Sequence, residues 1–461
     1  MASMDHSQHE GIWWLPEQDI PGRPGTLILD RDGVHLNLHG DLQIEVKAKK
    51  GSSNSGLDLT EHPVIHGETR NEVEVTLFNA RKQNTSHRLI GETSYRPELA
   101  LLGSHVLDPK FSEVRAEIDQ LVDWMDAPPL SEQMKGGRPS FGSLDLLQAR
   151  TNDADVRVFV HTPGRYSRRR VNVEQNCQVS IVSDGPMDWR SMIDSRIKPF
   201  HDFLMLALGT PLAMNGLYLR PWKSREICTA YMQRRYLKPG KESLTEGWWN
   251  APARLAGVPT LLTAEDRDVN LPELVSRWYE LHNELRDVMS LLMAPFYAPF
   301  IYSEHRFASY FQALEALHAK FYEARDTGKA LHAQRVEKAI KAMGGKGLEE
   351  DTLSWVKNVL TGRNDKPLRR RVLEVVESTE DVGDYILGVA PNFARNVVLG
   401  RTAVSHGGAK PVASESQFWH GEVLLWVMRT RILTESGVPH VYKKAVKKDD
   451  FRYAVNQISE V

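Results

Sequence analysis

Arg401 and His406 lie five positions apart in the segment Arg401-Thr-Ala-Val-Ser-His406-Gly-Gly, and both side chains suit chemistry on a phosphodiester. Histidine exchanges a proton near neutral pH, and arginine offers a planar fork of N–H donors that binds phosphate oxygens. RNA is cut without a metal ion when its own 2′-OH attacks the neighbouring phosphorus, which requires proton transfer and neutralisation of growing negative charge. The two residue types therefore meet both requirements of metal-independent RNA cleavage.

The spacing of the two residues constrains how they act. Residues five apart on a continuous α-helix point about 140° from each other, because each residue turns the chain by about 100°. The diglycine Gly407-Gly408 predicts that the helix ends at His406, where the negative end of the helix dipole favours a protonated imidazole. His406 is therefore expected to serve as a general acid rather than a base. The structural alternative for both residues is an ordinary helix C-terminus, where basic side chains cap carbonyl groups.

Glu315 is a further candidate, because it lies along the apolar stripe of a predicted helix. The stripe consists of Phe307, Phe311, Leu314 and His318. A carboxylate beside such a stripe is costly unless it has a partner, and Arg401 is one such partner, which the carboxylate would hold in place. A carboxylate at the edge of the stripe, bonded to a nearby lysine or hydrated, is the alternative.

The elements that must position these residues are helices. Apolar residues recur at three- and four-residue intervals from Leu271 onward, and glycines stand where helices are expected to stop. A helical bundle is the economical architecture. The predicted helices are Leu271 to Leu292, Glu304 to Arg325, Lys329 to Met343, Thr352 to Leu360, Leu368 to Ser378, Val382 to Ser405 and Ser414 to Thr434.

The first part of the chain has a different pattern, in which short β-like runs alternate with turn residues. One long helix, Met187 to Gly209, follows the start signal Asp184-Gly185-Pro186, and residues 227–236 add further strand character. Residues 47–56 are expected to form a loop. The clearest strands are Thr26 to Leu29, Val34 to Leu38, Gln43 to Val46, Glu72 to Phe78, Val156 to His161 and Val179 to Val182.

The sequence thus predicts an α+β multidomain protein. A β-rich, sandwich-like domain occupies residues 1–265, and an all-α bundle occupies residues 266–461. The fractions of apolar residues, 41%, and charged residues, 26%, are those of a globular chain. Two cysteines without CxxC spacing, a polar N-terminus unlike a signal peptide and no long apolar run together favour a cytoplasmic protein with no membrane association.

Binding to RNA requires a local basic surface, because the net charge of the chain is only −2. The cluster Arg165-Tyr-Ser-Arg-Arg-Arg170 and the tail lysines are candidates, although most charge runs are solvated faces. The histidines form no HExxH or comparable cluster, so neither a metal nor a cofactor is expected. The candidate RNA contacts near the motif and in the tail are Arg395, Lys443, Lys444, Lys447 and Lys448.

Several motifs together resemble a known family. Arg401-TAVS-His406 fits the shortest form of the HEPN signature, an Arg and a His separated by four to six residues. Glu304-His-Arg-Phe-Ala-Ser-Tyr-Phe-Gln-Ala-Leu-Glu-Ala-Leu317 and Pro367-Leu-Arg-Arg-Arg-Val-Leu373 are similar to helices of the ApeA-like HEPN domain. Gly11-Ile-Trp-Trp-Leu-Pro16, Gly25-Thr-Leu and Leu36-Asn-Leu-His-Gly40 resemble the opening of the ApeA N-terminal domain. The family often has Asn after the motif Arg, where this chain has Thr402; the dipeptide Arg395-Asn396 lies too far from His406 to replace it.

This resemblance implies an endoribonuclease of prokaryotic anti-phage defence that acts by abortive infection. HEPN domains pair, so a homodimer or higher homo-oligomer is expected, with two motifs facing each other across one RNA-sized cleft. Arg401 and His406 would be catalytic, with Glu315, Thr402 and Ser405 in support, and the N-terminal domain would sense a phage-derived activator or restrain the nuclease. The alternatives are a non-catalytic HEPN module that dimerises or binds RNA or nucleotide, and the toxin of a toxin-antitoxin pair.

Overall fold

The computed structural model describes most of the chain, and its contacts divide the chain into two compact units. The first unit is Met1–Glu280 with Phe296–Pro299, and the second is Leu281–Pro295 with Phe300–Val461. The domain boundary predicted after residue 265 stays a prediction. The described residues are 6–17, 21–30, 33–42, 61–86, 92–128, 134–135, 138–139, 143–161, 164–167, 170–173, 176–232, 259–298, 301–323, 325–345, 347–406 and 414–459.

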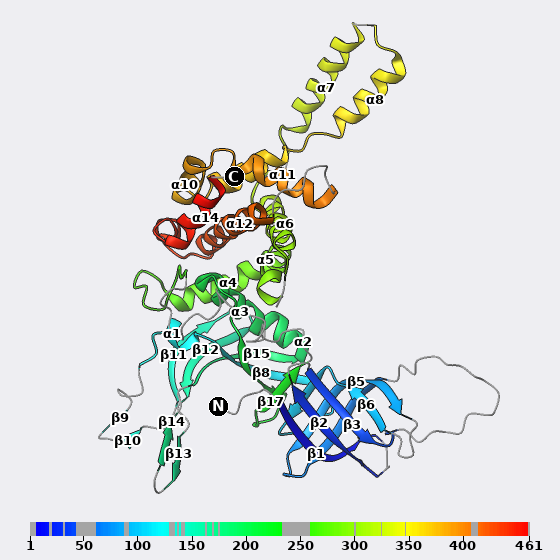
Figure 1. The fold of residues 1–461 in the computed structure, drawn as a ribbon, viewed down its shortest axis with the longest axis vertical. Helices are drawn as coiled ribbons and strands as arrows, with labels where there is room; N and C mark the ends of the chain where they lie inside the picture. The colour runs from blue at the N-terminus through cyan, green and yellow to red at the C-terminus, as the bar shows by residue number, and fades with distance from the viewer. Residues whose placement is uncertain are drawn as a thin grey trace, which may run out of the picture. The chain divides into compact units, whose positions relative to one another are not determined.

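Six antiparallel strands of the first unit close into a barrel (Figure 1). Their order around the barrel is β5-β4-β1-β2-β3-β6, and pairing of β6 with β5 closes the ring. Alternate residues point inward and form a core that includes Trp13, Leu36 and Tyr95, each at most 1% exposed. The strands are β1 (His6–Trp14), β2 (Arg23–Asp30), β3 (Gly33–His39), β4 (Glu61–Thr69), β5 (Glu74–Ser86) and β6 (Glu92–Arg96).

The same sheet continues beyond the barrel, because β5 also pairs with β7. Its order from that junction is β7-β17-β16-β8-β15-β12-β11. The β-rich class is therefore confirmed, while a closed barrel with a sheet extension replaces the sandwich-like arrangement. The strands are β7 (Leu99–Leu102), β8 (Lys110–Ile118), β11 (Ser143–Arg150), β12 (Ala154–His161), β15 (Asn176–Asp188), β16 (Met214–Pro221) and β17 (Cys228–Met232), beside two small hairpins, β9 (Met134–Lys135) with β10 (Arg138–Pro139) and β13 (Gly164–Ser167) with β14 (Arg170–Val173).

The strands predicted within β2, β3, β12 and β15 are confirmed. The run Glu72 to Phe78 overlaps β5, which begins at Glu74. The strand predicted at Gln43 to Val46 and the loop predicted at residues 47–56 lie outside the described residues.

The long helix predicted in the first unit is present as three consecutive segments. They are α2 (Trp189–Met192), a π-helical turn at Ile193–Ile197 and α3 (Lys198–Leu208); α1 (Leu121–Trp124) is a single earlier turn. The predicted start at Asp184 to Pro186 is wrong, because those residues belong to β15. Asp188 caps the helix instead, since its side chain accepts hydrogen bonds from the backbone N–H groups of Arg190 and Ser191.

The helical half of the chain confirms the predicted bundle. Two predicted helices are each split in two, one at Leu285 and the other at Ala390 to Asn392, around Pro391. Two short helices at the C-terminus are additional to the predicted set. The helices are α4 (Leu271–Glu284), α5 (Arg286–Tyr297), α6 (Ser303–Phe321), α7 (Lys329–Gly344), α8 (Glu350–Thr361), α9 (Leu368–Glu377), α10 (Asp381–Val389), α11 (Phe393–His406), α12 (Ser414–Glu435), α13 (Val441–Ala445) and α14 (Asp449–Ser459).

Helix α12 is the centre of the second unit. It packs against α6, α11, α13 and α14, and most of its residues from Ser416 to Leu433 are buried on every side. A helix buried all round is a core element, not a surface helix. Helix α9 contacts α6, α10 and α11.

Two global features bear on the predicted class of protein. Among the described residues, no helix combines the length and apolar character needed to cross a bilayer. Cys177 and Cys228 are both buried and unpaired with each other, and burial raises the pKa of their thiols to about 12 and about 11.

Two glycines on α10 should respond in opposite directions to the same substitution. A Cβ at Gly383 would lie 2.2 Å from the carbonyl oxygen of Val376, whereas a Cβ at Gly388 would meet nothing within 4 Å. We expect Gly383→Ala to lower the free energy of unfolding by about 1–3 kcal/mol through overpacking. Gly388→Ala should raise it by about 0.5–1 kcal/mol through helix propensity. Urea denaturation followed by circular dichroism measures both, and equal effects would contradict the tight α9–α10 contact.

Candidate functional site

Helix α11 carries both residues of the predicted catalytic pair. Ala394, Val397 and Gly400 are buried on the face that packs into the bundle, and Arg401 is half-buried at the edge of that face. Thr402 is exposed, and its hydroxyl donates a hydrogen bond to the carbonyl oxygen of Val398 at 2.9 Å. The packed face therefore fixes the helix rotation and with it the direction in which Arg401 leaves the backbone.

A close contact seats α11 on α6. A Cβ at Gly400 would lie 3.1 Å from the ring of Phe307, so the absence of a side chain lets the two helices approach. Gly421 of α12 meets the same residue from another side, where a Cβ would lie 3.5 Å from the Cα atom of Phe307. Phe307 is 1% exposed. The residue immediately before Arg401 is thus held against the most buried part of the bundle.

The outer face of α11 has a different composition. Arg395, Leu399 and Thr402 recur there at helical spacing and are exposed, with Leu399 53% exposed. The helical register places position 406 on this same face, about 140° around the axis from Arg401. The helix itself extends to His406, but the side chains of Ser405 and His406 and the whole diglycine lie outside the described residues. The predicted helix stop therefore stays a prediction.

Glu315 lies on α6 and is half-buried. Among the described residues it forms no ion pair with Arg401. Gly400, the residue before Arg401, lies against Phe307 of α6, which is eight residues before Glu315 and so about 12 Å from it along the helix axis. The structure thus brings α11 to the N-terminal half of α6, whereas Glu315 is nearer its C-terminal end.

A polar cluster near the crossing of α6 and α12 was not found by sequence reasoning. Arg306 lies beside Phe307, and its Nη1 atom is 3.2 Å from Oε1 of Glu422, the neighbour of Gly421. Arg429 is 1% exposed and stacks over Trp426, with 4.7 Å from its Cζ atom to the ring centre. Arg306 and Arg429 lower the pKa of Glu422, but burial outweighs them and raises it. Burial also lowers the pKa of Arg429, to about 10. The sequence signal that could have revealed this cluster is a carboxylate, Glu422, within the otherwise apolar run Gly421-Glu422-Val-Leu-Leu.

A second cluster joins α6 to α9. The His318 ring is 1% exposed, and its Nε2 atom lies 2.8 Å from Oε2 of Glu374. Lys366 donates to both oxygens of the same carboxylate, at 2.8 and 2.9 Å. Burial works against the charge on Glu374, but the hydrogen bonds from Lys366 and His318 outweigh it and lower the pKa of the carboxyl to about 2. The cluster holds α9 to the bundle.

The other predicted contacts are dispersed. Lys443 and Lys444 lie on α13 and Lys447 and Lys448 follow it, whereas Arg395 lies on α11. The side chains from Arg165 to Arg170 lie outside the described residues. In the part of the chain that the structure describes, no group of three or more His, Cys, Asp or Glu side chains could hold a metal ion.

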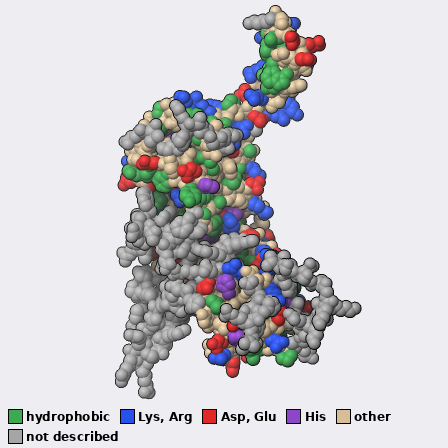
Figure 2. Space-filling view, turned by 45° about the vertical axis from the view of Figure 1, so that its right-hand side comes forward, with side chains coloured by type: hydrophobic (Ala, Val, Ile, Leu, Met, Phe, Trp, Pro, Cys, Tyr) green, Lys and Arg blue, Asp and Glu red, His purple; other side chains and the backbone are tan. Residues whose placement is uncertain are grey.

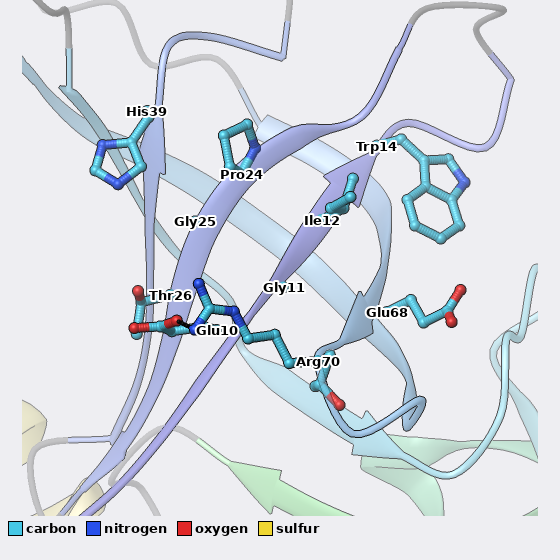
Figure 3. A pocket seen from close by; sticks show the side chains of 11 residues that line it. Glu10, Gly11, Ile12, Trp14, Pro24, Gly25, Thr26, His39, Glu68 and Arg70 are labelled. Carbon is cyan, nitrogen blue, oxygen red and sulfur yellow. Dashed lines mark ion pairs between the residues drawn. The ribbon is translucent and has the colours of Figure 1, made fainter.

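The barrel carries a separate hollow of about 610 Å³ along β1, β2 and β4. Arg70 reaches across it to Glu10, with 2.5 Å between Nη1 and Oε2 (Figure 3). Both side chains are more than half exposed, so this ion pair adds little stability. The lining combines charged side chains with the exposed apolar side chain of Ile12.

Comparison with family models accounts for both units. The model of ApeA N-terminal domain 1 matches residues 8–278, more than half of the chain, and the Apea-like HEPN model matches residues 308–441. The chain belongs to the ApeA family. No curated protein and no solved structure matches it.

The ApeA N-terminal domain 1 thus contains the barrel and the sheet that continues from it. The HEPN domain contains α11 with Arg401 and His406, together with the α6–α12 core. HEPN domains are typically ribonucleases. Of the predicted RNA contacts, Arg395 falls inside the HEPN match and the four tail lysines lie beyond it.

The Glu374 cluster should make the stability of the HEPN domain depend on pH. The carboxyl has a pKa of about 2 in the folded chain, below its ordinary 4.5, so its contribution is complete above about pH 4.5 and is lost as the pH falls toward 2. We expect Glu374→Gln to remove this acid dependence and to lower stability at neutral pH by about 1–3 kcal/mol. Denaturant titrations across this pH range measure both effects.

Glu377→Gln is the matched control, because it changes the same charge on the same helix. Glu377 is 46% exposed, and its ion pair with Arg370 spans 3.7 Å. Exposed pairs contribute about 0–1 kcal/mol. An equal pH response in both variants would contradict the assignment of the acid dependence to Glu374.

Proposed function

We propose that this protein is a metal-independent endoribonuclease of prokaryotic anti-phage defence. Its HEPN domain cuts RNA, and its N-terminal domain controls the cutting in response to infection. The observation that carries the proposal is that Arg401 and His406 occupy one helix, α11, inside the matched HEPN region, and that this helix is anchored by Gly400 against Phe307.

The two residues take different parts in the reaction. Arg401 binds the non-bridging phosphoryl oxygens and neutralises the charge that grows on them. The 2′-OH attacks phosphorus and releases its proton to solvent water, the bond to the 5′-oxygen breaks, and His406 gives its own proton to that leaving oxygen. The products are a 2′,3′-cyclic phosphate and a 5′-OH. The reaction needs no metal ion, because a guanidinium and an imidazolium supply the charge and the proton.

A second copy of the chain completes the site in this proposal. Positions 401 and 406 lie about 140° apart around α11, so one helix cannot direct both side chains at the same phosphate along a single face. The outer face carries Leu399, which is 53% exposed beside the motif. A homodimer that packs the outer faces of two α11 helices together would bury this leucine and bring two motifs to one cleft.

Cleavage of RNA in the presence of EDTA tests the catalytic pair. We expect His406→Ala to reduce the rate about 10²–10⁴-fold through loss of the general acid. Arg401→Ala should reduce it about 10²–10³-fold through loss of transition-state charge stabilisation, with little rescue by Arg401→Lys because a lysine lacks the bidentate fork. The ends of the products are identified by mass spectrometry.

Exposed residues of the same types serve as controls. Arg452→Ala on α14 and His161→Ala on β12 should leave the rate unchanged. The assignment fails if His406→Ala cuts normally, if cleavage requires added metal, or if the products carry no cyclic phosphate. Retained RNA binding without any cleavage by the wild type would favour a non-catalytic HEPN module.

The dimer is tested by a charge placed on the outer face of α11. We expect Leu399→Asp to convert the oligomer to a monomer in light scattering and to abolish cleavage, although Arg401 and His406 remain in place, because a buried carboxylate without a partner is strongly unfavourable at an interface. Leu144→Asp is the matched control, since Leu144 is 44% exposed on β11. A dimer that survives Leu399→Asp would place the interface elsewhere.

A further inference from the structure

Helices α7 and α8 form an antiparallel pair that packs mainly on itself and projects from the HEPN bundle (Figure 1). We call this pair, residues Lys329–Thr361, the helical arm. Val336 is the one buried side chain described on α7, and none is described on α8. Trp355 is 65% exposed and Leu331 48% exposed. Two helices with so small a core have most of their surface free to contact another molecule.

The arm and its flanks carry a net positive charge, unlike the chain as a whole. Residues 325–371 contain twelve Lys or Arg and six Asp or Glu, a net charge of +6, whereas the whole chain has −2. Figure 2 shows Lys and Arg side chains gathered near the base of the arm and along the adjoining edge of the bundle. Three of the six acids, Glu349, Glu350 and Asp351, stand at the start of α8, where the helix dipole stabilises them.

One face of α7 concentrates the positive charge. Arg335, Lys338 and Lys341 follow each other at intervals of three, so they fall within about 120° of the helix circumference and span about 9 Å along its axis. All three are exposed, and Arg335 also forms an ion pair with Asp326, with 3.7 Å between Nη1 and Oδ2. The helical register places the buried Val336 on the opposite side of α7. This row of three cations is therefore directed to solvent.

The arm is fixed at its base by hydrogen bonds. The Nδ2 atom of Asn364 donates to the carbonyl oxygen of Thr327 at 2.8 Å, and the carbonyl oxygen of Asn364 accepts from the N–H of Asp326 at 2.8 Å. Higher up, the Nε2 atom of His332 lies 3.0 Å from the carbonyl oxygen of Leu360. These contacts join the two ends of the arm to each other.

We propose that the helical arm is an RNA-binding element that grips the phosphate backbone with Arg335, Lys338 and Lys341 and stacks a base on Trp355. This inference rests on the proposed ribonuclease function, because it identifies a surface that would bind the part of the RNA substrate beyond the Arg401 site. A row of cations with an exposed aromatic is the composition of surfaces that bind single-stranded nucleic acid. The cores of protein interfaces are depleted of charge, so a protein partner fits this face less well.

The test measures RNA binding separately from cleavage. The probe is a fluorescent single-stranded RNA with 2′-O-methyl riboses, which cannot attack their own phosphates, and its affinity for the full chain is measured at several salt concentrations. We expect the triple variant Arg335→Gln/Lys338→Gln/Lys341→Gln to weaken binding on the order of 10-fold or more and to reduce the salt slope by about 2. Trp355→Ala should weaken binding about 5- to 150-fold with little change in the salt slope.

A matched control removes the same charge elsewhere. Lys110, Lys223 and Arg225 are three exposed cations near one turn of the first unit, and Lys110→Gln/Lys223→Gln/Arg225→Gln changes the net charge by the same amount. This variant should bind the probe as the wild type does. Equal weakening by both triple variants would overturn the proposal, because the effect would then be one of net charge.

The remaining outcomes separate the arm from the catalytic site. If the wild type cuts no RNA but the arm variants lose binding, the arm is supported and the ribonuclease proposal fails. If the wild type cuts RNA and the arm variants keep the affinity and the salt slope, the arm proposal fails alone. A change of oligomeric mass in the arm variants, with RNA binding intact, would show that the arm is a protein interface. That result would overturn the arm proposal as well.

Discussion

The contact of Phe307 with two glycines is the constraint on which the rest of the HEPN domain depends. Gly400 of α11 and Gly421 of α12 both face this buried residue of α6; a Cβ atom would be tight against the Phe307 ring at Gly400 and in ordinary contact with its Cα atom at Gly421. Three helices therefore meet closely in one layer around Phe307. Arg401 follows Gly400 directly, so its direction is a consequence of this layer. Helix α11, which carries the proposed catalytic pair, is thus held by packing rather than by an ion pair between Arg401 and Glu315.

Charges inside the bundle add specificity to that packing. Arg306 and Glu422 join α6 to α12 next to the Phe307 layer, and His318 and Glu374 join α6 to α9. Buried or half-buried charges contribute little net stability, because their desolvation offsets their attraction. Removing one partner is nevertheless costly, so each pair opposes any shift of its helices along each other. Apolar contacts set the separation of the helices, and these polar pairs set their register.

The periodicity of apolar residues was enough to predict most of the helices, because an amphipathic pattern is a local property of the sequence. Closure of the barrel was not predictable in this way, since the pairing of β5 with β6 in addition to β4 and β7 is a tertiary event that no alternation of residues encodes. Pro391 and Asp188 were local signals for the helix break and the helix cap. Both were overlooked because each lies within or beside a long run with helical periodicity. Glu422 shows the same limit: its position in an apolar run was visible, but its partner Arg306 lies more than one hundred residues away.

The geometry of α11 has a consequence for control of the proposed enzyme. If one chain cannot direct Arg401 and His406 at the same phosphate, activity depends on a second copy, and any change in assembly changes the rate directly. The N-terminal domain then needs no contact with the catalytic residues to regulate them. A barrel surface that favours or blocks pairing of HEPN domains would suffice. A ligand of the barrel would then shift the equilibrium between monomer and dimer by the difference between its binding free energies for the two states. In such an arrangement the helical arm supplies affinity for RNA in either state, while the paired α11 helices supply the chemistry.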